Sequence, residues 1–483
     1  MTDKVAVLSA APDPLLTSLK RPRARVRLGT AWPNEQRYVL DVLLGEHLGL
    51  SYEIEAVPGL SWVEIDFPDI KTGCRLQVGA NLFLRPQAQW LSASATPVLP
   101  LENLDCRAVV PDWEFGSIPV LFPPASKPRV GSAEKDALFL PVDIFGAAFF
   151  LLTRYEELVV KGRDKHGRFC ARDSAGYRAG LLERPLVDEY SRLLGRALRV
   201  CVPGLEFRRH PARIRLSHDI DHPYQFFHKS TGHMAYSAAK ELFRNPSLRR
   251  AWDLARAGAC SGFGGDVLSD PFNSYASLMN AGEALGVACE FYFMTVQRRG
   301  RYEEAYDLNK PELQELLRRI HGRGHVIGLH ASYDSFSSSQ TLKKELDFLL
   351  SSARRAGVTL EAVGGRQHYL RWENPTTWRS WEQAGLTYDT TVGFAEHVGF
   401  RCGTCRDFPA FDLLESRKLD LRERPLALMD ATLKDYLKLG PEEMVNQMRN
   451  LWAAVKGVGG TLEVLIHNCN PQGPWLARQL CSL

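Results

Sequence analysis

Short apolar runs alternate with longer amphipathic stretches along the C-terminal half of the chain. Residues 213–216 alternate polar and apolar side chains, as a half-buried strand does. Residues 274–285 carry apolar side chains at helical spacing, and another helix is predicted from Pro311 to Gly322. Further strand candidates are residues 288–294, 325–330, 358–363, 426–429 and 462–466. This succession is typical of an α/β domain built on a parallel sheet or barrel.

The N-terminal part of the chain has a mixed α/β pattern. Apolar side chains recur at helical spacing in residues 144–159 and again in residues 186–198. Between these stretches, residues 164–168 (Asp-Lys-His-Gly-Arg) predict an exposed turn. His166 in that turn has no partner at metal-ligand spacing, so the sequence does not single it out as a ligand.

A domain boundary is indicated by Pro203-Gly204 and by the basic, proline-containing stretch 208–211. A chain of 483 residues with 45% hydrophobic and 24% charged residues is long enough for at least two hydrophobic cores. We therefore predict a mixed α/β domain in residues 1–205 and a second α/β domain in residues 212–483.

The charge of the chain argues against a nucleic-acid partner. Sixty basic residues stand against 56 acidic residues, which leaves a formal net charge of +4. This excess is too small and too dispersed to form the concentrated basic surface that binds phosphates. We expect no polyanionic partner.

The apolar and cysteine patterns indicate a protein of the cytoplasm. The most apolar stretch, residues 138–152, is interrupted by Asp143 and is shorter than the about 20 residues that span a bilayer. The N-terminus shows no pattern of a secretory signal, and we expect no integral membrane segment. Ten cysteines without a dense framework fit a reducing compartment, and the lone pair Cys402 and Cys405 favours a structural role.

Ionisable side chains follow the predicted strands of the second domain at the point where each strand ends. They are Asp219, Asp221, His330, Arg366, Asp430 and His467. Because the carboxyl ends of parallel strands meet at one edge of a sheet or barrel, these side chains are expected to converge. A single Asp or His at a strand end usually caps a helix or forms a hydrogen bond within a loop. The evidence for a functional site is therefore that several such residues are expected to converge.

Two of these positions suggest a metal ion. Asp219 and Asp221 are two residues apart and face the same side of an extended chain, where two carboxylates repel unless a cation neutralises one of them. An ion on one carboxylate leaves the other free as a base. His330 and Asp334 are four residues apart and could complete an Asp/His/Asp site with Asp221. The alternatives are an ordinary pair of turn aspartates and, for Asp334, a helix cap.

The order of four motifs resembles that of the NodB-type polysaccharide deacetylases, also called carbohydrate esterase family four. The motifs are His218-Asp-Ile-Asp221, Gly324-His-Val-Ile-Gly-Leu-His330 with Asp334, Gly365-Arg-Gln-His-Tyr369 and Leu465-Ile-His-Asn468. The resemblance covers about residues 212–470 and implies a distorted (β/α) barrel. The whole chain also resembles bacterial proteins of polysaccharide gene clusters, in which an uncharacterised N-terminal domain precedes such a domain.

The resemblance implies roles for residues at matching positions. Asp219 takes the place of the general base, Asp221 and His330 those of metal ligands, Arg366 that of the arginine that orients the base, and His467 that of the general acid. His368 and Tyr369 fall in the loop that contacts the substrate and stabilises the oxyanion.

The sequence departs from the family in three places. Its two aspartates are separated by Ile220, where the family has an adjacent pair. Asp334 replaces the second histidine ligand, and Gln367-His368 replaces the middle of the R-x-P-Y loop. We assign Asp334 as the third ligand, with His222 or a water molecule as alternatives.

These patterns predict a metal-dependent hydrolase. We expect a bound divalent ion, of which zinc is the favoured candidate. We expect the reaction to be removal of an N-acetyl group from an amino sugar of a polysaccharide or glycan precursor. Removal of an O-acetyl group is the less favoured variant. One alternative is hydrolysis of another C–N bond, such as that of a cyclic amide. The other is a non-catalytic saccharide-binding protein that kept the barrel and lost a ligand.

Overall fold

The chain forms two compact units. The computed structural model describes residues 22–70, 74–126, 137–226, 267–296 and 300–483, together with positions 232, 239 and 243. The first unit comprises Met1–Val160 and Leu186–His210, and the second comprises Lys161–Pro185 and Pro211–Leu483. Residues 161–185 thus belong with the C-terminal unit, whereas the sequence analysis included them in the domain 1–205.

Contacts that are distant along the chain explain this difference. The Phe400 amide donates a hydrogen bond of 2.6 Å to the Leu182 carbonyl. The Ala171 amide donates one of 2.6 Å to Glu396, 225 positions away. Gly399 has a φ of 120°, and a Cβ there would lie 2.3 Å from the Leu182 carbonyl oxygen, so the close approach requires glycine. Local patterning does not reveal such contacts.

The first unit is built on a five-stranded mixed sheet in the order β2-β1-β3-β4-β7. The strands are β1 (Ala24–Leu28), β2 (Tyr52–Ala56), β3 (Trp62–Asp66), β4 (Arg75–Gly79) and β7 (Ala137–Leu140), and a separate antiparallel pair is formed by β5 (Glu102–Asp105) and β6 (Ser117–Val120). The helices are α1 (Pro33–Leu40), α2 (Ile144–Leu152), α3 (Glu156–Val159) and α5 (Leu186–Cys201). β1 pairs in parallel with β2, and β4 with β7, whereas β3 is antiparallel to both of its neighbours.

Helix α2 is the most apolar element of this unit, and all nine of its residues are buried. Asp143 caps it by accepting a hydrogen bond of 2.7 Å from the Gly146 amide, and it also accepts bonds from the Asn81 and Leu82 amides. The apolar stretch 138–152 is therefore divided between a strand and a capped helix. Among the described residues, no helix combines the length and the apolar composition needed to cross a membrane.

The second unit is built on a curled nine-stranded sheet in the order β13-β14-β12-β11-β10-β9-β8-β16-β15. The strands are β8 (Ala212–Ile220), β9 (Glu290–Phe293), β10 (Val326–Ala331), β11 (Gly365–Gln367), β12 (Tyr388–Asp389), β13 (Phe408–Asp412), β14 (Arg417–Glu423), β15 (Leu428–Met429) and β16 (Gly460–Leu465). All neighbours are parallel except β13 and β14.

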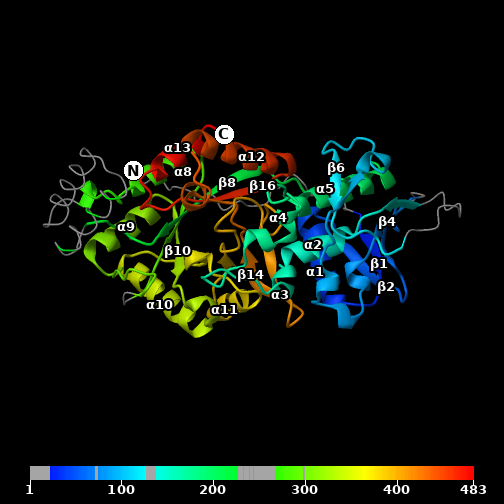
Figure 1. Ribbon diagram of the computed structural model, residues 1–483, viewed down its shortest axis with the longest axis horizontal. Helices are drawn as coiled ribbons and strands as arrows, with labels where there is room; N and C mark the ends of the chain where they lie inside the picture. The colour runs from blue at the N-terminus through cyan, green and yellow to red at the C-terminus, as the bar shows by residue number, and fades with distance from the viewer. Residues whose placement is uncertain are drawn as a thin grey trace. The chain divides into compact units, whose positions relative to one another are not determined.

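Helices surround the outside of the curled sheet (Figure 1). They are α8 (Tyr275–Ala284), α9 (Pro311–Gly322), α10 (Ser339–Arg355), α11 (Thr376–Ala384), α12 (Pro441–Val458) and α13 (Gly473–Leu480), and the short α4 (Ala175–Arg178) lies in the 161–185 segment. Because the strands other than β13 run in parallel, their carboxyl ends share one edge, in agreement with the parallel sheet or barrel that the strand pattern predicts.

Several charged side chains of the sheet and the loops beside it form ion pairs. Arg215 on β8 contacts Asp407 at 2.9 Å and Glu463 at 3.3 Å. Arg424 contacts Glu290 at 3.1 Å. Buried charges require such partners, because their desolvation is otherwise too costly.

One predicted strand is displaced. The apolar residues 358–363 are not in a strand, and β11 begins at Gly365 instead. A Cβ on Gly365 would lie 1.8 Å from the Leu329 carbonyl oxygen, so β11 approaches β10 more closely than any side chain permits. The strands β12, β13 and β14 were not expected from the sequence.

Candidate metal centre and active site

A pocket of about 410 Å³ lies at the carboxyl ends of the strands in the second unit. Its volume is within the usual range for sites that bind small molecules. Its charged and polar lining residues are Arg168, Asp219, Asp221, His222, Tyr302, Glu303, Glu304, His330, His368, Tyr369, Asp435, Tyr436 and His467. The sequence-predicted residues Asp219, Asp221, His330, His368, Tyr369 and His467 are thus brought together.

Asp219 and Arg366 form a buried pair at the base of this site. Arg366 Nη1 donates a hydrogen bond of 2.7 Å to Asp219 Oδ1, and its Nη2 donates one of 2.9 Å to Ser217 Oγ. Arg366 Nε also donates to the Thr390 carbonyl at 3.1 Å. The guanidinium is fully buried and held at three points, so it fixes the orientation of the Asp219 carboxylate.

Asp221, His330 and His368 form a compact group whose candidate ligand atoms all lie within 4.8 Å of one another. His330 Nε2 lies 3.0 Å from Asp221 Oδ1, and His368 Nε2 lies 3.7 Å from the same oxygen. In a tetrahedral zinc site with bonds of about 2.1 Å, ligand atoms are about 3.4 Å apart. One carboxylate and two imidazoles at these separations are suited to a single divalent ion.

The hydrogen bonding of His330 supports this interpretation. Its Nδ1 lies 3.0 Å from the Arg366 carbonyl, which can only accept, so Nδ1 carries the proton. In the neutral ring, Nε2 then carries a lone pair, and this lone pair faces the Asp221 carboxylate. Asp221 Oδ1 is buried and has no hydrogen-bond partner among the described residues. Two electron-rich atoms so placed need a cation between them, either a proton or a metal ion.

The electrostatics of Asp221 match a ligand that stays ionised. Burial raises the pKa of this carboxyl, but the hydrogen bond that a doubly protonated His330 ring donates and the charges of His368 and His467 outweigh it. Together they hold the pKa of Asp221 well below its ordinary value. The carboxylate is thus available to a cation at neutral pH.

Asp334, the third ligand predicted from the sequence, lies outside this group. Its side chain is 90% exposed and pairs with Arg371 Nη1 at 2.7 Å. β10 ends at Ala331, and the chain turns away from the site before Asp334, which precedes a short 3-10 helix. The four-residue spacing from His330 therefore does not bring the two side chains together, and His368 stands in the place assigned to Asp334.

His222, the alternative third ligand, is also separate from the group. Its Nδ1 lies 3.1 Å from Glu304 Oε2, and its side chain is 38% exposed. Glu303, next to Glu304, instead faces the metal-ligand group, with Oε1 3.9 Å from His368 Nδ1. A carboxylate behind a histidine ligand orients the ring and raises its basicity.

His467 lies on another side of Asp221 and is paired with Asp430. Its Nδ1 is 2.6 Å from Asp430 Oδ1, and its Nε2 is 3.9 Å from Asp221 Oδ2. Burial lowers the pKa of His467, but the charge and hydrogen bond of Asp430 outweigh it and raise the pKa to about 10. The imidazole is therefore protonated at neutral pH and directs a donor toward the site.

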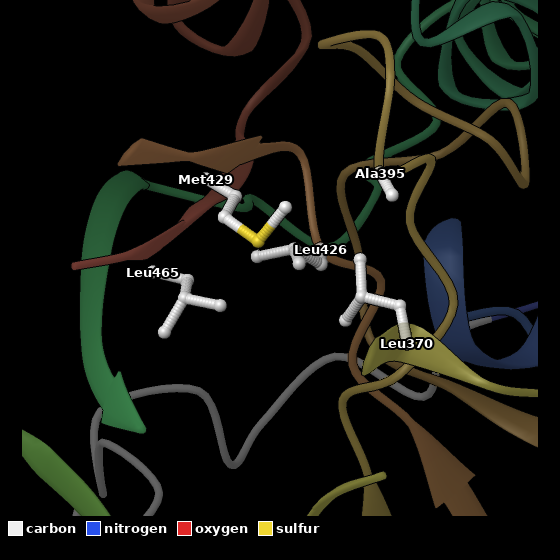
Figure 2. Packing of buried hydrophobic residues seen from close by; sticks show 5 residues of the cluster. All are labelled: Leu370, Ala395, Leu426, Met429 and Leu465. Atoms are coloured by element: carbon white, nitrogen blue, oxygen red, sulfur yellow. The ribbon is translucent and has the colours of Figure 1, made fainter. Parts of the chain in front are cut away.

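One wall of the pocket is apolar. Leu370, Met429 and Leu465 belong to a buried cluster that also includes Ala395 and Leu426 (Figure 2). The first three line the pocket directly. A small apolar group of a ligand could pack against them while polar atoms face the histidines and aspartates.

The sequence analysis did not single out Glu303, the partnership of Asp430 with His467, or the residues of the 161–185 segment. Asp430 was recognised only as a residue at a strand end. Arg168 lines the pocket, and its Nη1 donates a hydrogen bond of 2.8 Å to the Tyr369 carbonyl, 201 positions away. The turn at 164–168 was recognised but expected to be exposed, whereas His166 and Arg168 are buried. No local pattern signals a partner so distant in the chain.

One family model matches part of the chain. Residues 28–203 match the model of a family of unknown function (DUF7033). No curated protein matches the chain.

Three solved structures are similar to a little over half of the chain. A protein assigned as a polysaccharide deacetylase of Mycobacterium smegmatis is 15% identical, with a TM-score of 0.34, and the match covers 56% of this chain and 83% of that one. PuuE allantoinase is 9% identical, with a TM-score of 0.34 and coverages of 57% and 86%. The Xyl-CE4 domain of a multidomain xylanase from the hindgut metagenome of Trinervitermes trinervoides is 12% identical, with a TM-score of 0.26 and coverages of 57% and 82%. Such distant similarities do not identify an activity.

Proposed function

We propose that this protein is a metal-dependent hydrolase that removes the N-acetyl group from an amino sugar of a glycan or glycan precursor. The observation that carries the proposal is that three functional groups contribute side chains to one pocket. They are the metal-ligand partners His330 and His368, the buried pair of Asp219 and Arg366, and the pair of His467 and Asp430. A cation site, a base and an acid in one pocket are the parts that amide hydrolysis requires.

Asp221, His330 and His368 are the residues that would hold the ion. A bound divalent ion would supply Lewis-acid activation of the acetyl carbonyl and of a water molecule. His330 Nδ1 is engaged by the Arg366 carbonyl, which leaves Nε2 for the ion, and Glu303 stands behind His368. The hydrogen bond to the Arg366 carbonyl orients the His330 ring, and the Glu303 carboxylate lies near His368 without a hydrogen bond to it.

Asp219 is the general base of the proposed reaction. It is not part of the metal-ligand group, and Arg366 fixes the direction of its carboxylate. It accepts a proton from the water as that water adds to the carbonyl carbon.

His467 is the general acid. Its Nδ1 is held by Asp430, so its Nε2 presents a proton to the pocket. As the C–N bond breaks, the proton passes to the leaving nitrogen, and the products are acetate and a free amine. The backbone near Tyr369, next to the metal-ligand group, is the candidate donor to the oxyanion.

The acyl part of the substrate fits the apolar wall. Leu370, Met429 and Leu465 line the pocket and present only hydrocarbon and thioether surface. A methyl group packs there without burying unpaired polar atoms, whereas a charged acyl chain would. This supports an acetyl group as the part removed.

Acetate release from a panel of amides tests the proposal. The panel contains N-acetylglucosamine, its β-1,4-linked dimer and longer oligomers, a nucleotide-linked N-acetylhexosamine, an O-acetylated xylose and the cyclic amide dihydrouracil. Protein loaded with Zn²⁺ is compared with protein stripped by a chelator and with Asp219→Asn. We expect acetate from at least one N-acetylated sugar, only with metal and only with the intact Asp219.

The other results of this assay contradict the proposal in different ways. Hydrolysis of the cyclic amide alone would establish a hydrolase of another C–N bond. Saturable sugar binding without acetate, in protein that retains no metal, would establish a saccharide-binding protein. Acetate release that survives both metal removal and Asp219→Asn would exclude the mechanism.

A further inference from the structure

The turn at residues 164–168 is a rigid element of the pocket rim. Asp164 Oδ1 accepts hydrogen bonds from the backbone amides of His166, at 2.8 Å, and Arg168, at 2.9 Å. The Asp164 amide donates to the Arg168 carbonyl at 2.9 Å, and Gly167 between them has a φ of 77°. A side chain bonded to its own turn and a glycine in the left-handed region fix the conformation locally.

This turn presents two side chains to the loops that follow the strands. Arg168 Nη1 donates to the Tyr369 carbonyl at 2.8 Å, after β11, and Nη2 lies 3.3 Å from the Tyr436 hydroxyl, after β15. His166 Nδ1 lies 3.1 Å from the Tyr333 hydroxyl, after β10, and its ring centre is 4.7 Å from that of Tyr369. One turn thus connects three separate parts of the rim.

The Tyr369 loop needs such support. Tyr369 and Leu370 have φ values of 62° and 53°, so two consecutive residues with side chains occupy the left-handed region. Each costs about 1 kcal/mol or more, and such backbone persists only when the surroundings hold it. The loop begins at His368, whose Nε2 faces Asp221. Its conformation therefore determines where His368 and the Tyr369 backbone lie.

We propose that Arg168 is a positioning residue for the proposed deacetylase site. It holds the strained loop so that His368 and the Tyr369 backbone face the reacting group. Direct recognition of an anionic substrate is disfavoured, because Nε and Nη2 contact Asp164 at 2.8 and 2.7 Å and Nη1 is used by Tyr369. The inference rests on the proposed function and gives the 28–203 region, which contains this turn, a part in the reaction.

The test compares Arg168→Ala with Arg172→Ala, an exposed arginine four positions later in the same segment. We expect Arg168→Ala to lower kcat about 10- to 100-fold, because small displacements at a reacting centre have effects of this size. KM for the most active sugar of the panel should change less than about threefold, because the donors of Arg168 are already engaged by Asp164 and the Tyr369 carbonyl. Millimolar guanidinium should restore part of the lost kcat in Arg168→Ala, and Arg172→Ala should match the wild type.

Hydrogen exchange provides a readout that is independent of activity. Amides of residues 366–371 should exchange faster in Arg168→Ala than in the wild type and in Arg172→Ala. If Arg168→Ala does not fold, Arg168→Lys is the second variant. Lysine keeps the positive charge but lacks the guanidinium group that contacts two partners at once. Arg168→Lys should therefore show the same changes to a smaller extent.

Two outcomes would overturn the inference. Unchanged exchange in residues 366–371 would show that the loop does not depend on Arg168, whether or not a substrate has been found. A rise in KM with unchanged kcat would make Arg168 a substrate-binding residue. Absence of acetate release by the wild type would contradict the proposed function instead, and the exchange measurement would still decide the role of Arg168.

Discussion

The candidate site is assembled from two regions that reach the pocket in different ways. Asp219, His330 and Arg366 lie in strands of the curled sheet, and their positions follow from the two-residue repeat of a strand and the shared carboxyl edge. Arg168 lies in a turn whose partners are about 200 positions away. The strands carry the groups assigned to the chemistry, whereas the turn fixes the loop beside them. Substitutions in the first region should therefore abolish reaction steps, and substitutions in the second should weaken them.

The largest effect is expected from loss of a metal ligand. His368→Ala and Asp221→Ala should each lower the affinity for Zn²⁺ by at least 10- to 100-fold, since even residues behind the ligands commonly have effects of this size. Metal content after dialysis, measured by mass spectrometry, tests this. Asp334→Ala is the matched control, because Asp334 is exposed and paired with Arg371, and its metal content should equal that of the wild type. Metal loss in Asp334→Ala with retention in His368→Ala would restore the ligand set predicted from the sequence.

Removal of the base should separate chemistry from binding. Asp219→Asn is nearly isosteric and keeps a partner for Arg366, but it cannot accept a proton. Turnover should fall about 10²- to 10⁴-fold, with metal content and KM close to normal. Steady-state kinetics and metal analysis on one preparation test this, with the exposed Asp347→Asn as the control. Loss of metal in Asp219→Asn would instead make Asp219 a ligand.

The pH dependence of turnover should report the pair of His467 and Asp430. A protonated His467 donates to the leaving nitrogen, so activity is lost as pH rises through its pKa. Asp430 raises that pKa to about 10 against the opposing effect of burial. Asp430→Asn removes the negative charge, so the pKa of His467 should fall and the alkaline limb of kcat should move to lower pH. An alkaline limb that stays in place would show that another group is the acid.

Strand register indicates where side chains within a strand point, but it does not place residues further along the chain. Asp219 and His330 lie within strands, and the strand register places their side chains. Asp334 lies three residues beyond the end of β10, where the direction of the chain is set by its turn and by Arg371 rather than by a repeat. His368 was identified in its motif, but it follows the end of β11, where strand register no longer indicates the direction of a side chain.

The division into compact units differs from the predicted domains for a related reason. Residues 161–185 lie between two apolar helical stretches of the first unit, so local pattern assigns them to that unit. Their hydrogen bonds to Glu396 and Phe400 assign them to the second unit. Contacts between residues that are distant along the chain decide which unit such a segment joins. No pattern in a single sequence reveals those contacts.

The smallest expected effect distinguishes a positioning turn from an ordinary one. Gly167 and Gly180 both lie in the 161–185 segment, with φ values of 77° and 68°, and a Cβ at either position would meet no atom within 4 Å. Alanine should therefore destabilise both variants by about 1 kcal/mol, for the same conformational reason. Only Gly167 lies between His166 and Arg168, so only Gly167→Ala should lower kcat, by a few fold. Thermal unfolding and kinetics of the two variants side by side test this. If the two variants lose equal stability but only Gly167→Ala loses turnover, the turn contributes to the reaction. If both variants have equal turnover, the turn is only a structural connection.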